Sequence, residues 1–152
     1  MNRFENKTAL VTGGGSGIGK SICRRLASEG ARVLIFDLNL DSAKFVASEI
    51  EEASGTATAF ACDVADHNRV EEIVSGVLAT SDIDVLVNNA GIAHVGNLEN
   101  TSEADLDRLL SVNVKGVYNM LAAVVPAMKA RRSGAILNMA SVASSVGIAD
   151  RF

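Results

Sequence analysis

The sequence has only two cysteines, one proline, one tyrosine and no tryptophan in 152 residues. Cys23 and Cys62 lie far apart and outside any CxxC or Cys/His spacing, which argues against a disulfide framework or a metal site and fits a reducing cytoplasm. The net charge of −4 provides no electrostatic reason to bind nucleic acid or an anionic membrane. No run approaches the roughly 18 apolar residues that cross a bilayer, and the N-terminus lacks the apolar segment of a signal peptide. We therefore expect a cytoplasmic protein without a nucleic-acid or membrane partner.

Short apolar runs alternate with helical patterns along the whole chain. The runs at residues 8–12, 33–36, 58–62, 85–88 and 135–139 lack the two-residue alternation of strands that face water on one side. Such runs are typical of parallel strands covered on both faces. The order predicts an α/β fold, a doubly wound parallel sheet with helices on both faces. We expect residues 1–152 to form one domain that is incomplete at its C-terminus, because the pattern calls for another helix and strand.

One helical pattern is longer than the others. Ser102 and Asp105 have the spacing of a capping box at a helix N-terminus. Apolar residues then recur at helical spacing toward Met128: Leu106, Leu109, Leu110, Val117, Leu121 and Val125. Pro126 is expected to bend or fray the end of this helix, because proline has no backbone N–H to donate.

A glycine-rich loop, TGGGSGIGK, joins the first predicted strand to the first predicted helix at residues 12–20. In a doubly wound sheet this position turns backbone N–H groups and a helix N-terminus toward an anionic phosphate. Gly13 is expected to allow the turn, Gly17 to leave room for a pyrophosphate, and Gly19 to allow close approach of helix and sheet. The spacing departs from GxGxxG and lacks the GK[ST] of a P-loop. It predicts dinucleotide binding on a Rossmann-type fold, with a merely flexible turn as the alternative.

Asp37 ends the second predicted strand, about where an acidic residue meets the adenosine ribose of a dinucleotide. Its carboxylate can accept hydrogen bonds from both ribose hydroxyls and would repel a 2′-phosphate. Neither Ser16 nor Leu38 carries a positive charge to neutralise such a phosphate, so NAD is favoured over NADP. The alternative is that Asp37 only caps the turn that follows it.

Several motifs in this order resemble the classical short-chain dehydrogenases/reductases, over the full length of the chain. The loop TGGGSGIG fits the TGxxxGxG pattern of the family, CDV at 62–64 fits its adenine-contacting step, and NNAG at 88–91 fits a further motif. The resemblance implies that the dinucleotide contacts the following residues: Thr12, Gly13, Gly15, Ser16, Gly17, Ile18, Gly19, Asp37, Leu38, Asp63, Val64, Asn89, Ala90 and Gly91.

Two further residues match catalytic positions of the family. Asn113 in SVNVKG matches the asparagine of the long helix, which supports the active site and a water relay. Ser141 matches the serine after the fifth strand, where open α/β sheets build their sites, and its hydroxyl can donate to a substrate carbonyl or alkoxide. Asn113 lies between Leu109 and Val117 on the apolar stripe, where an unsatisfied amide costs free energy. The alternatives are an amide that braces a helix kink and a serine that only shapes a loop.

The YxxxK pair of the family does not occur in this sequence. The family's spacing from Ser141 places the tyrosine two positions after Phe152, and Tyr118 cannot replace it because no lysine follows four residues later. In the family the lysine binds the nicotinamide ribose and lowers the tyrosine pKa, and the tyrosine passes a proton as hydride moves. We therefore expect a longer complete protein, and residues 1–152 alone to be inactive.

His94 and Arg151 fall where the family lines its substrate pocket. Arg151 can clamp a carboxylate through two parallel hydrogen bonds. The stretch NMASVASSV together with Arg151 is similar to that of a cytosolic 3-hydroxybutyrate dehydrogenase of the family. A small hydroxy acid is therefore the first candidate substrate, ahead of sugars and 3-oxoacyl thioesters. The alternatives are a solvated charge at Arg151 and a surface or hydrogen-bonding role for His94.

The resemblance implies an oxidoreductase that transfers a hydride between NAD(H) and a small secondary alcohol or ketone. It also implies a homotetramer that packs through the long helix at residues 102–128, whose apolar residues lie on two sides. A non-catalytic dinucleotide-binding module, an inactive fragment and a nucleotide-sugar or phosphate-binding regulator are the alternatives. Ser141 and Asn113 favour the enzyme, because a protein that only binds the dinucleotide needs neither.

Overall fold

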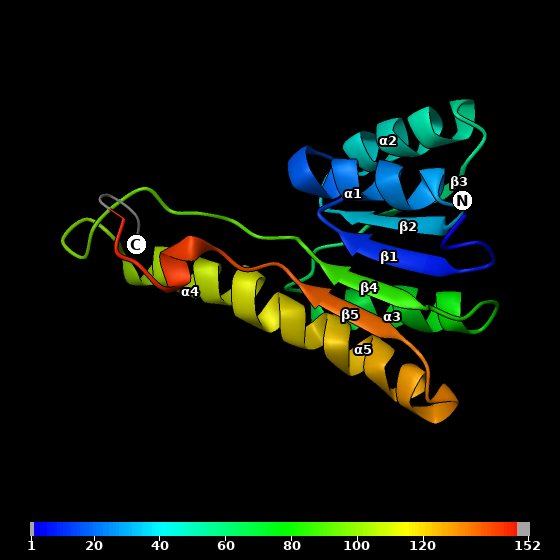
Figure 1. Ribbon diagram of the computed structural model, residues 1–152. Helices are drawn as coiled ribbons and strands as arrows, with labels where there is room; N and C mark the ends of the chain where they lie inside the picture. The colour runs from blue at the N-terminus through cyan, green and yellow to red at the C-terminus, as the bar shows by residue number, and fades with distance from the viewer. Residues whose placement is uncertain (1, 149–152) are drawn as a thin grey trace.

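A computed structural model describes residues 2–148 and shows the predicted α/β architecture (Figure 1). All five predicted strands form one parallel sheet in the order β3-β2-β1-β4-β5. The strands are β1 (Thr8–Thr12), β2 (Arg32–Asp37), β3 (Thr56–Ala61), β4 (Val85–Asn88) and β5 (Ala135–Asn138). The helices are α1 (Gly17–Ser28), α2 (Leu40–Glu52), α3 (His67–Leu78), α4 (Glu103–Leu110) and α5 (Gly116–Arg131). A π-helical turn at Ser111–Lys115 joins α4 to α5, and a 3-10 turn at Val142–Ser144 follows β5.

The strand order changes direction beside β1. The chain first winds outward from β1 through β2 to β3, then crosses to β4 on the other side of β1 and continues to β5. Val11 in β1 pairs with Ile35 in β2 on one side and with Val87 in β4 on the other. The connections after β1 and after β4 therefore leave in opposite directions, and a crevice opens between them at the carboxyl ends of these strands.

Two apolar cores lie on opposite faces of the sheet, because successive side chains of a strand point to opposite faces. Ala9 and Val11 of β1 belong to the core beneath α1 and α2, and Leu10 belongs to the core beneath α3 and α5. The first core contains Val33, Ile35, Cys23, Leu26, Ala43, Val46 and Ile50. The second contains Leu34, Phe36, Leu86, Val70, Ile73, Val74, Met120 and Val124. The prediction of helices on both faces is confirmed.

The long helix begins as predicted but ends later. The Ser102 hydroxyl accepts the N–H of Asp105 at 3.2 Å, and the Asp105 carboxylate accepts the N–H of Ser102 at 3.1 Å, which completes the capping box. The helix continues past Pro126 to Arg131, beyond the predicted end at Met128. It stops where Arg132 adopts a left-handed conformation with φ of 53°.

The buried face of this helix differs from the predicted apolar stripe. The buried residues of α5 are Gly116, Asn119, Met120, Val124 and Met128, whereas Val117, Leu121 and Val125 are only partly buried. Among the residues that the structure describes, none of α4 is buried, because α4 extends past the sheet (Figure 1). The stripe therefore marks the border of the buried face in α5, and in α4 Leu106 and Leu110 are exposed while Leu109 is partly buried.

The same helix bears on the expectation that no segment is long and apolar enough to cross a membrane. Glu103–Arg131 is 29 residues long and, by length and composition alone, is apolar enough to cross a membrane. Of its most apolar 18-residue stretch, 22% is buried in the structure. Core helices of soluble proteins pass the same test, so the property is weak evidence for a membrane segment. In this structure α5 packs on α3 and faces the second apolar core.

Strand β5 departs from the prediction of burial on both faces. All four of its residues are exposed, including Ile136 and Leu137. β5 is the outer strand of the described sheet and pairs only with β4, so one edge carries no neighbour within residues 2–148.

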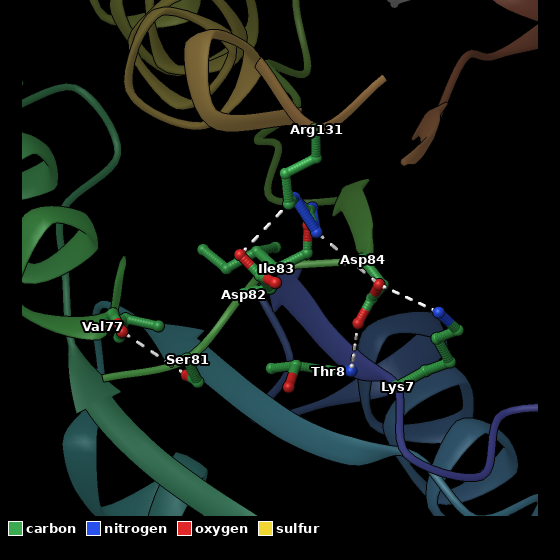
Figure 2. Close-up of polar contacts among 8 residues, drawn as sticks. All are labelled: Lys7, Thr8, Val77, Ser81, Asp82, Ile83, Asp84 and Arg131. Carbon is green, nitrogen blue, oxygen red and sulfur yellow. Dashed lines mark hydrogen bonds and ion pairs between the residues drawn. The ribbon is translucent and has the colours of Figure 1, made fainter. Parts of the chain in front are cut away.

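A polar network ties the end of α5 to the amino ends of β1 and β4 (Figure 2). The carboxylate of Asp84 accepts the backbone N–H of Thr8 at 3.0 Å and the Nζ of Lys7 at 3.2 Å. Arg131 donates from Nη2 to the carbonyl oxygen of Ile83 at 2.6 Å, and its Nη1 lies 3.8 Å from Asp84. Burial opposes ionisation of Asp84, but the Thr8 and Lys7 hydrogen bonds and the Arg131 charge outweigh it and lower the pKa of Asp84.

We expect Asp84→Asn to lower the free energy of unfolding by about 1 kcal/mol at pH 7, because it weakens charge-assisted hydrogen bonds. The pKa of the folded state lies below the ordinary 3.8, so the carboxylate stabilises the fold above that pH and stops doing so as pH falls through the lower value. Urea titrations at pH 7 and pH 3 measure the difference, with the exposed Glu51→Gln as control. An equal loss at both pH values would contradict the assignment to the carboxylate.

Candidate active site

The carboxyl ends of the strands around β1 open into a cleft of about 670 Å³. This volume is typical of small-molecule and cofactor sites. Most of the residues predicted to contact a dinucleotide line it: Gly13, Ser16, Gly17, Ile18, Gly19, Asp37, Leu38, Asp63, Val64, Asn89, Ala90 and Gly91. They come from loops that are far apart in sequence and that the parallel sheet brings to one edge.

Thr12 and Gly15, also predicted to contact the dinucleotide, are not among the lining residues. Thr12 is buried, and its hydroxyl accepts the backbone N–H groups of Asn89 and Ala90, both at 3.0 Å. The Asn89 amide in turn donates to the carbonyl oxygens of Thr12 and Gly13 at 3.0 and 3.2 Å. These bonds hold the loop after β4 against the glycine loop after β1, so Thr12 supports the wall of the cleft from behind.

Two glycines shape the cleft in different ways. A Cβ at Gly19 would collide with the carbonyl oxygen of Gly13 and lie 2.6 Å from the Nδ2 of Asn89, so only glycine allows α1 to begin this close to the loop. Gly17 has a positive φ of 51° and faces open space, with nothing within 4 Å of a Cβ there. Gly17, Ile18 and Gly19 of the first turn of α1 line the cleft, and a helix N-terminus at this position suits a phosphate.

The Asp37 carboxylate lies in the cleft wall with both oxygens held by backbone. One oxygen accepts the N–H of Gly15 at 2.8 Å and the other accepts the N–H of Asn39 at 2.9 Å. The second bond is the turn cap considered above as an alternative role. Each carboxylate oxygen has a further lone pair, so both remain able to accept a hydroxyl from a ligand in the cleft.

Asn113 lies in the π-helical turn rather than in the buried core. Its side chain is exposed. The amide makes two hydrogen bonds to the backbone of Ile92: its oxygen accepts the Ile92 N–H and its NH₂ group donates to the Ile92 carbonyl oxygen, both at 2.9 Å. The expectation of an amide on the buried stripe is therefore wrong, because α4 and the π turn lie beyond the sheet. The amide nonetheless makes two hydrogen bonds, which hold the segment after NNAG beside the cleft.

Ser141 lies past the carboxyl end of β5, at the same edge of the sheet as the cleft. Asn88 and Asn138 join β4 to β5 there through a side-chain hydrogen bond of 2.8 Å. Ser141 begins the 3-10 turn, and its hydroxyl accepts the N–H of Ala143 at 3.2 Å. It is exposed and is not among the residues that line the cleft.

The two predicted substrate residues have different outcomes. His94 is partly buried and lines a small cavity of about 230 Å³ with Asp105 and Arg108, next to the main cleft. The Nε2 of His94 is buried without a hydrogen-bond partner. Arg151 lies outside the described residues.

The structure adds cleft residues that the motifs did not predict. Cys62 belongs to the CDV motif but was not among the predicted contacts, and Ala65 and Ile92 directly follow the CDV and NNAG motifs, so extending each motif could have found them. Arg108, Ser111 and Val112 come from the long helix, and no local pattern marked them. Only the path of α4 and the π turn brings them to the cleft.

Cys62 has the chemistry of an inert thiol. Its burial raises its pKa to about 11, the nearby Arg69 charge only partly opposing this. Because the thiolate is the reactive form, we expect negligible alkylation of native protein by iodoacetamide at pH 7.5. Mass spectrometry checks this, with urea-denatured protein as the positive control. Rapid labelling of native Cys62 at pH 7.5 would contradict it.

The family model described as short chain dehydrogenase matches residues 7–151. The chain belongs to this family. A D-threitol dehydrogenase from Mycolicibacterium smegmatis is 41% identical over 147 residues, which are 96% of this chain and 56% of that protein. A 3-oxoacyl-[acyl-carrier-protein] reductase from Thermotoga maritima is 38% identical over 146 residues, 95% of this chain and 59% of that protein. The chain spans a little over half the length of these curated relatives.

Solved structures of members of this family have the same fold as the chain. A metagenomic short-chain oxidoreductase in complex with NADP has a TM-score of 0.93 and 39% identity, covering 97% of this chain and 68% of that one. An NAD⁺-bound xylitol dehydrogenase has a TM-score of 0.92 and 33% identity, covering 97% of this chain and 58% of that one. The family therefore binds nicotinamide dinucleotides, with NAD and NADP both represented among these neighbours.

Proposed function

We propose that the complete protein is an NAD-dependent dehydrogenase that interconverts a small secondary alcohol and its ketone. The observation that carries this proposal is the cleft at the β1/β4 switch point, in which the N-terminus of α1 and the Asp37 carboxylate face one open space. Both groups suit parts of the same ligand: backbone N–H groups for a pyrophosphate and a carboxylate for ribose hydroxyls.

The choice of NAD over NADP rests on the charges around Asp37. Its neighbours in the cleft wall, Ser16 and Leu38, carry no positive charge. A 2′-phosphate placed on the ribose would meet the Asp37 carboxylate without a cation to neutralise it, and like charges at close range cost affinity. The ribose hydroxyls of NAD would instead donate to that carboxylate.

We assign the catalytic step to Ser141 and Asn113, neither of which is among the residues that line the cleft. When bound, the nicotinamide ring accepts or supplies the hydride. We assign Ser141 to hold the reacting oxygen through its hydroxyl, and Asn113 to keep the segment at Ile92 in place and to support a water relay. The proton would pass through the tyrosine of a YxxxK pair, which residues 1–152 do not contain.

The substrate belongs to the small hydroxylated molecules. The small cavity lined by His94, Asp105 and Arg108 provides hydrogen-bond donors and acceptors, which suit a polyol, and Arg108 offers a cation for the carboxylate of a hydroxy acid. The similar D-threitol dehydrogenase and xylitol dehydrogenase carry polyol names, and the similar reductase carries a 3-oxoacyl name. A small hydroxy acid or polyol therefore leads, ahead of a 3-oxoacyl thioester.

We also propose a cytoplasmic homotetramer that packs through the long helix. Leu106, Leu110, Val114 and Tyr118 are exposed and four residues apart, so they form one apolar stripe along α4 and the start of α5. An exposed stripe of this kind suits a symmetric contact with a second copy. Light scattering of the complete protein tests it: a monomer mass at micromolar concentration would contradict the proposal.

Titration of the purified protein with NADH and NADPH tests the function directly. We expect NADH to bind at least about tenfold more tightly, a difference of about 1.4 kcal/mol. Equal or tighter binding of NADPH would contradict the cofactor assignment. Turnover of small polyols and hydroxy acids by the complete protein then separates the enzyme from a binding module, which would bind NADH and oxidise no secondary alcohol.

A further inference from the structure

One buried polar side chain on α5 contacts the cofactor cleft from behind. Asn119 is 1% exposed and donates from Nδ2 to the carbonyl oxygen of Val64 at 2.8 Å. Val64 and its neighbours Cys62 and Asp63 line the cleft, whereas Asn119 does not. A buried amide is retained at low cost only where its hydrogen bonds are made. The Asn119 amide therefore fixes the position of the loop after β3 through its hydrogen bond to Val64.

The orientation of the Asn119 amide follows from its partners. A backbone carbonyl can only accept, so the NH₂ group must face Val64 and the amide oxygen must face away from it. That oxygen lies 3.2 Å from the Nδ1 of His67, the first residue of α3, which makes Nδ1 the protonated ring nitrogen. Asn119 thus joins α5 to both the cleft loop and the helix that follows the loop.

Gly116 makes a second close contact between α5 and the same loop. A Cβ at Gly116 would lie 2.6 Å from Cγ2 and 3.1 Å from Cβ of Val64, so glycine alone permits this approach without a shift of the loop. Gly116 and Asn119 lie three residues apart on the buried face of one helix. Together they determine how far Val64 stands from the helix.

We propose that Asn119 is a positioning residue of the cofactor cleft, which holds the Asp63–Val64 step at the distance that the adenosine half of the dinucleotide requires. The inference rests on the proposed function. The helix that carries Asn119 continues from the π turn in which Asn113 grips Ile92. One continuous helix therefore sets two walls of the cleft, Val64 on one side and Ile92 on the other.

The test compares Asn119→Leu and Gly116→Ala with wild type in the complete protein. We expect either change to raise the Kd for NADH about five- to tenfold, which corresponds to about one hydrogen bond of binding free energy. The Kd for AMP, which has only the adenosine half of the dinucleotide, should rise by the same factor. Measurements are made below each variant's unfolding transition, as judged by circular dichroism. If Asn119→Leu does not fold, Gly116→Ala decides, because it moves the same loop from the other side.

Val124→Ala is the matched control, since Val124 is fully buried on the same helix, does not line the cleft and has no polar side chain to bond the loop after β3. It should lower the thermal midpoint and leave both Kd values unchanged. Unchanged Kd values in Asn119→Leu and Gly116→Ala, or an equal rise in Val124→Ala, would overturn the inference. Wild type that binds neither NADH nor AMP would instead refute the proposed function.

Discussion

Asp37→Ala is expected to raise the Kd for NADH about 100-fold and to raise the Kd for NADPH far less. The carboxylate would accept hydrogen bonds from two ribose hydroxyls. A hydrogen bond to a charged group contributes about 1.5–3 kcal/mol to binding, so losing both accounts for a change of this size. Without it a 2′-phosphate no longer meets a negative charge. Loss of the Asp37 bond to the N–H of Gly15 loosens the glycine loop for both ligands, so the decisive quantity is the ratio of the two Kd values.

Fluorescence titration with both reduced dinucleotides measures this ratio. Asp41→Ala is the control, because it removes the same charge from an exposed position on α2 that does not line the cleft. An equal rise in both Kd values for Asp37→Ala would mean that the residue only braces the loop. Unchanged Kd values for both dinucleotides would show that Asp37 does not contribute to the binding site.

Ser141→Ala in the complete protein is expected to lower kcat about 10²- to 10³-fold, the usual cost of losing one hydrogen-bond donor to a developing oxyanion. The Kd for NADH should stay the same, because Ser141 is not among the residues that line the cleft. The change also removes the bond that the hydroxyl accepts from the N–H of Ala143, so Ser141→Thr is the variant that keeps a hydroxyl.

Steady-state kinetics with saturating NAD and a small polyol or hydroxy acid provide the measurement. Ser141→Thr should retain much more activity than Ser141→Ala, and Ser145→Ala, in the same loop, should behave as wild type. An unchanged kcat in Ser141→Ala would show that Ser141 only shapes the loop and takes no part in catalysis. A loss of NADH affinity that matched the loss of kcat would show damage to the cleft instead.

The strands and the first half of the site were predictable because their causes are local. A continuous apolar run such as residues 8–12 identifies a strand buried on both faces, and the glycine loop that follows it lines the cleft as its position at the strand end predicts. Asp37 could be placed for the same reason, since a residue at the end of a parallel strand lies at the carboxyl edge of the sheet. The capping box at Ser102 was likewise contained in four consecutive residues.

The errors concern which face of an element meets the rest of the chain. The stripe through Val117 and Leu121 had the correct period, but the buried face turned out to centre on Met120 and Val124. Asn113 was placed in the core and is exposed, and β5 was expected to be covered and is not. In each case the hydropathy of a residue indicates what it can bury, whereas the neighbours available in the described chain decide what is buried.

By itself the sequence determined the α/β class, the order of the strands along the chain, the position of the glycine-rich loop after the first strand and the identity of the family, because each depends on spacing within a short segment. Tertiary structure alone decided that Arg108, Ser111 and Val112 reach the cleft and that Asn119 supports it from behind. These residues carry no local signal: Asn119 lies 55 positions from its partner Val64, and only the packing of α5 against the loop after β3 brings the amide to that carbonyl.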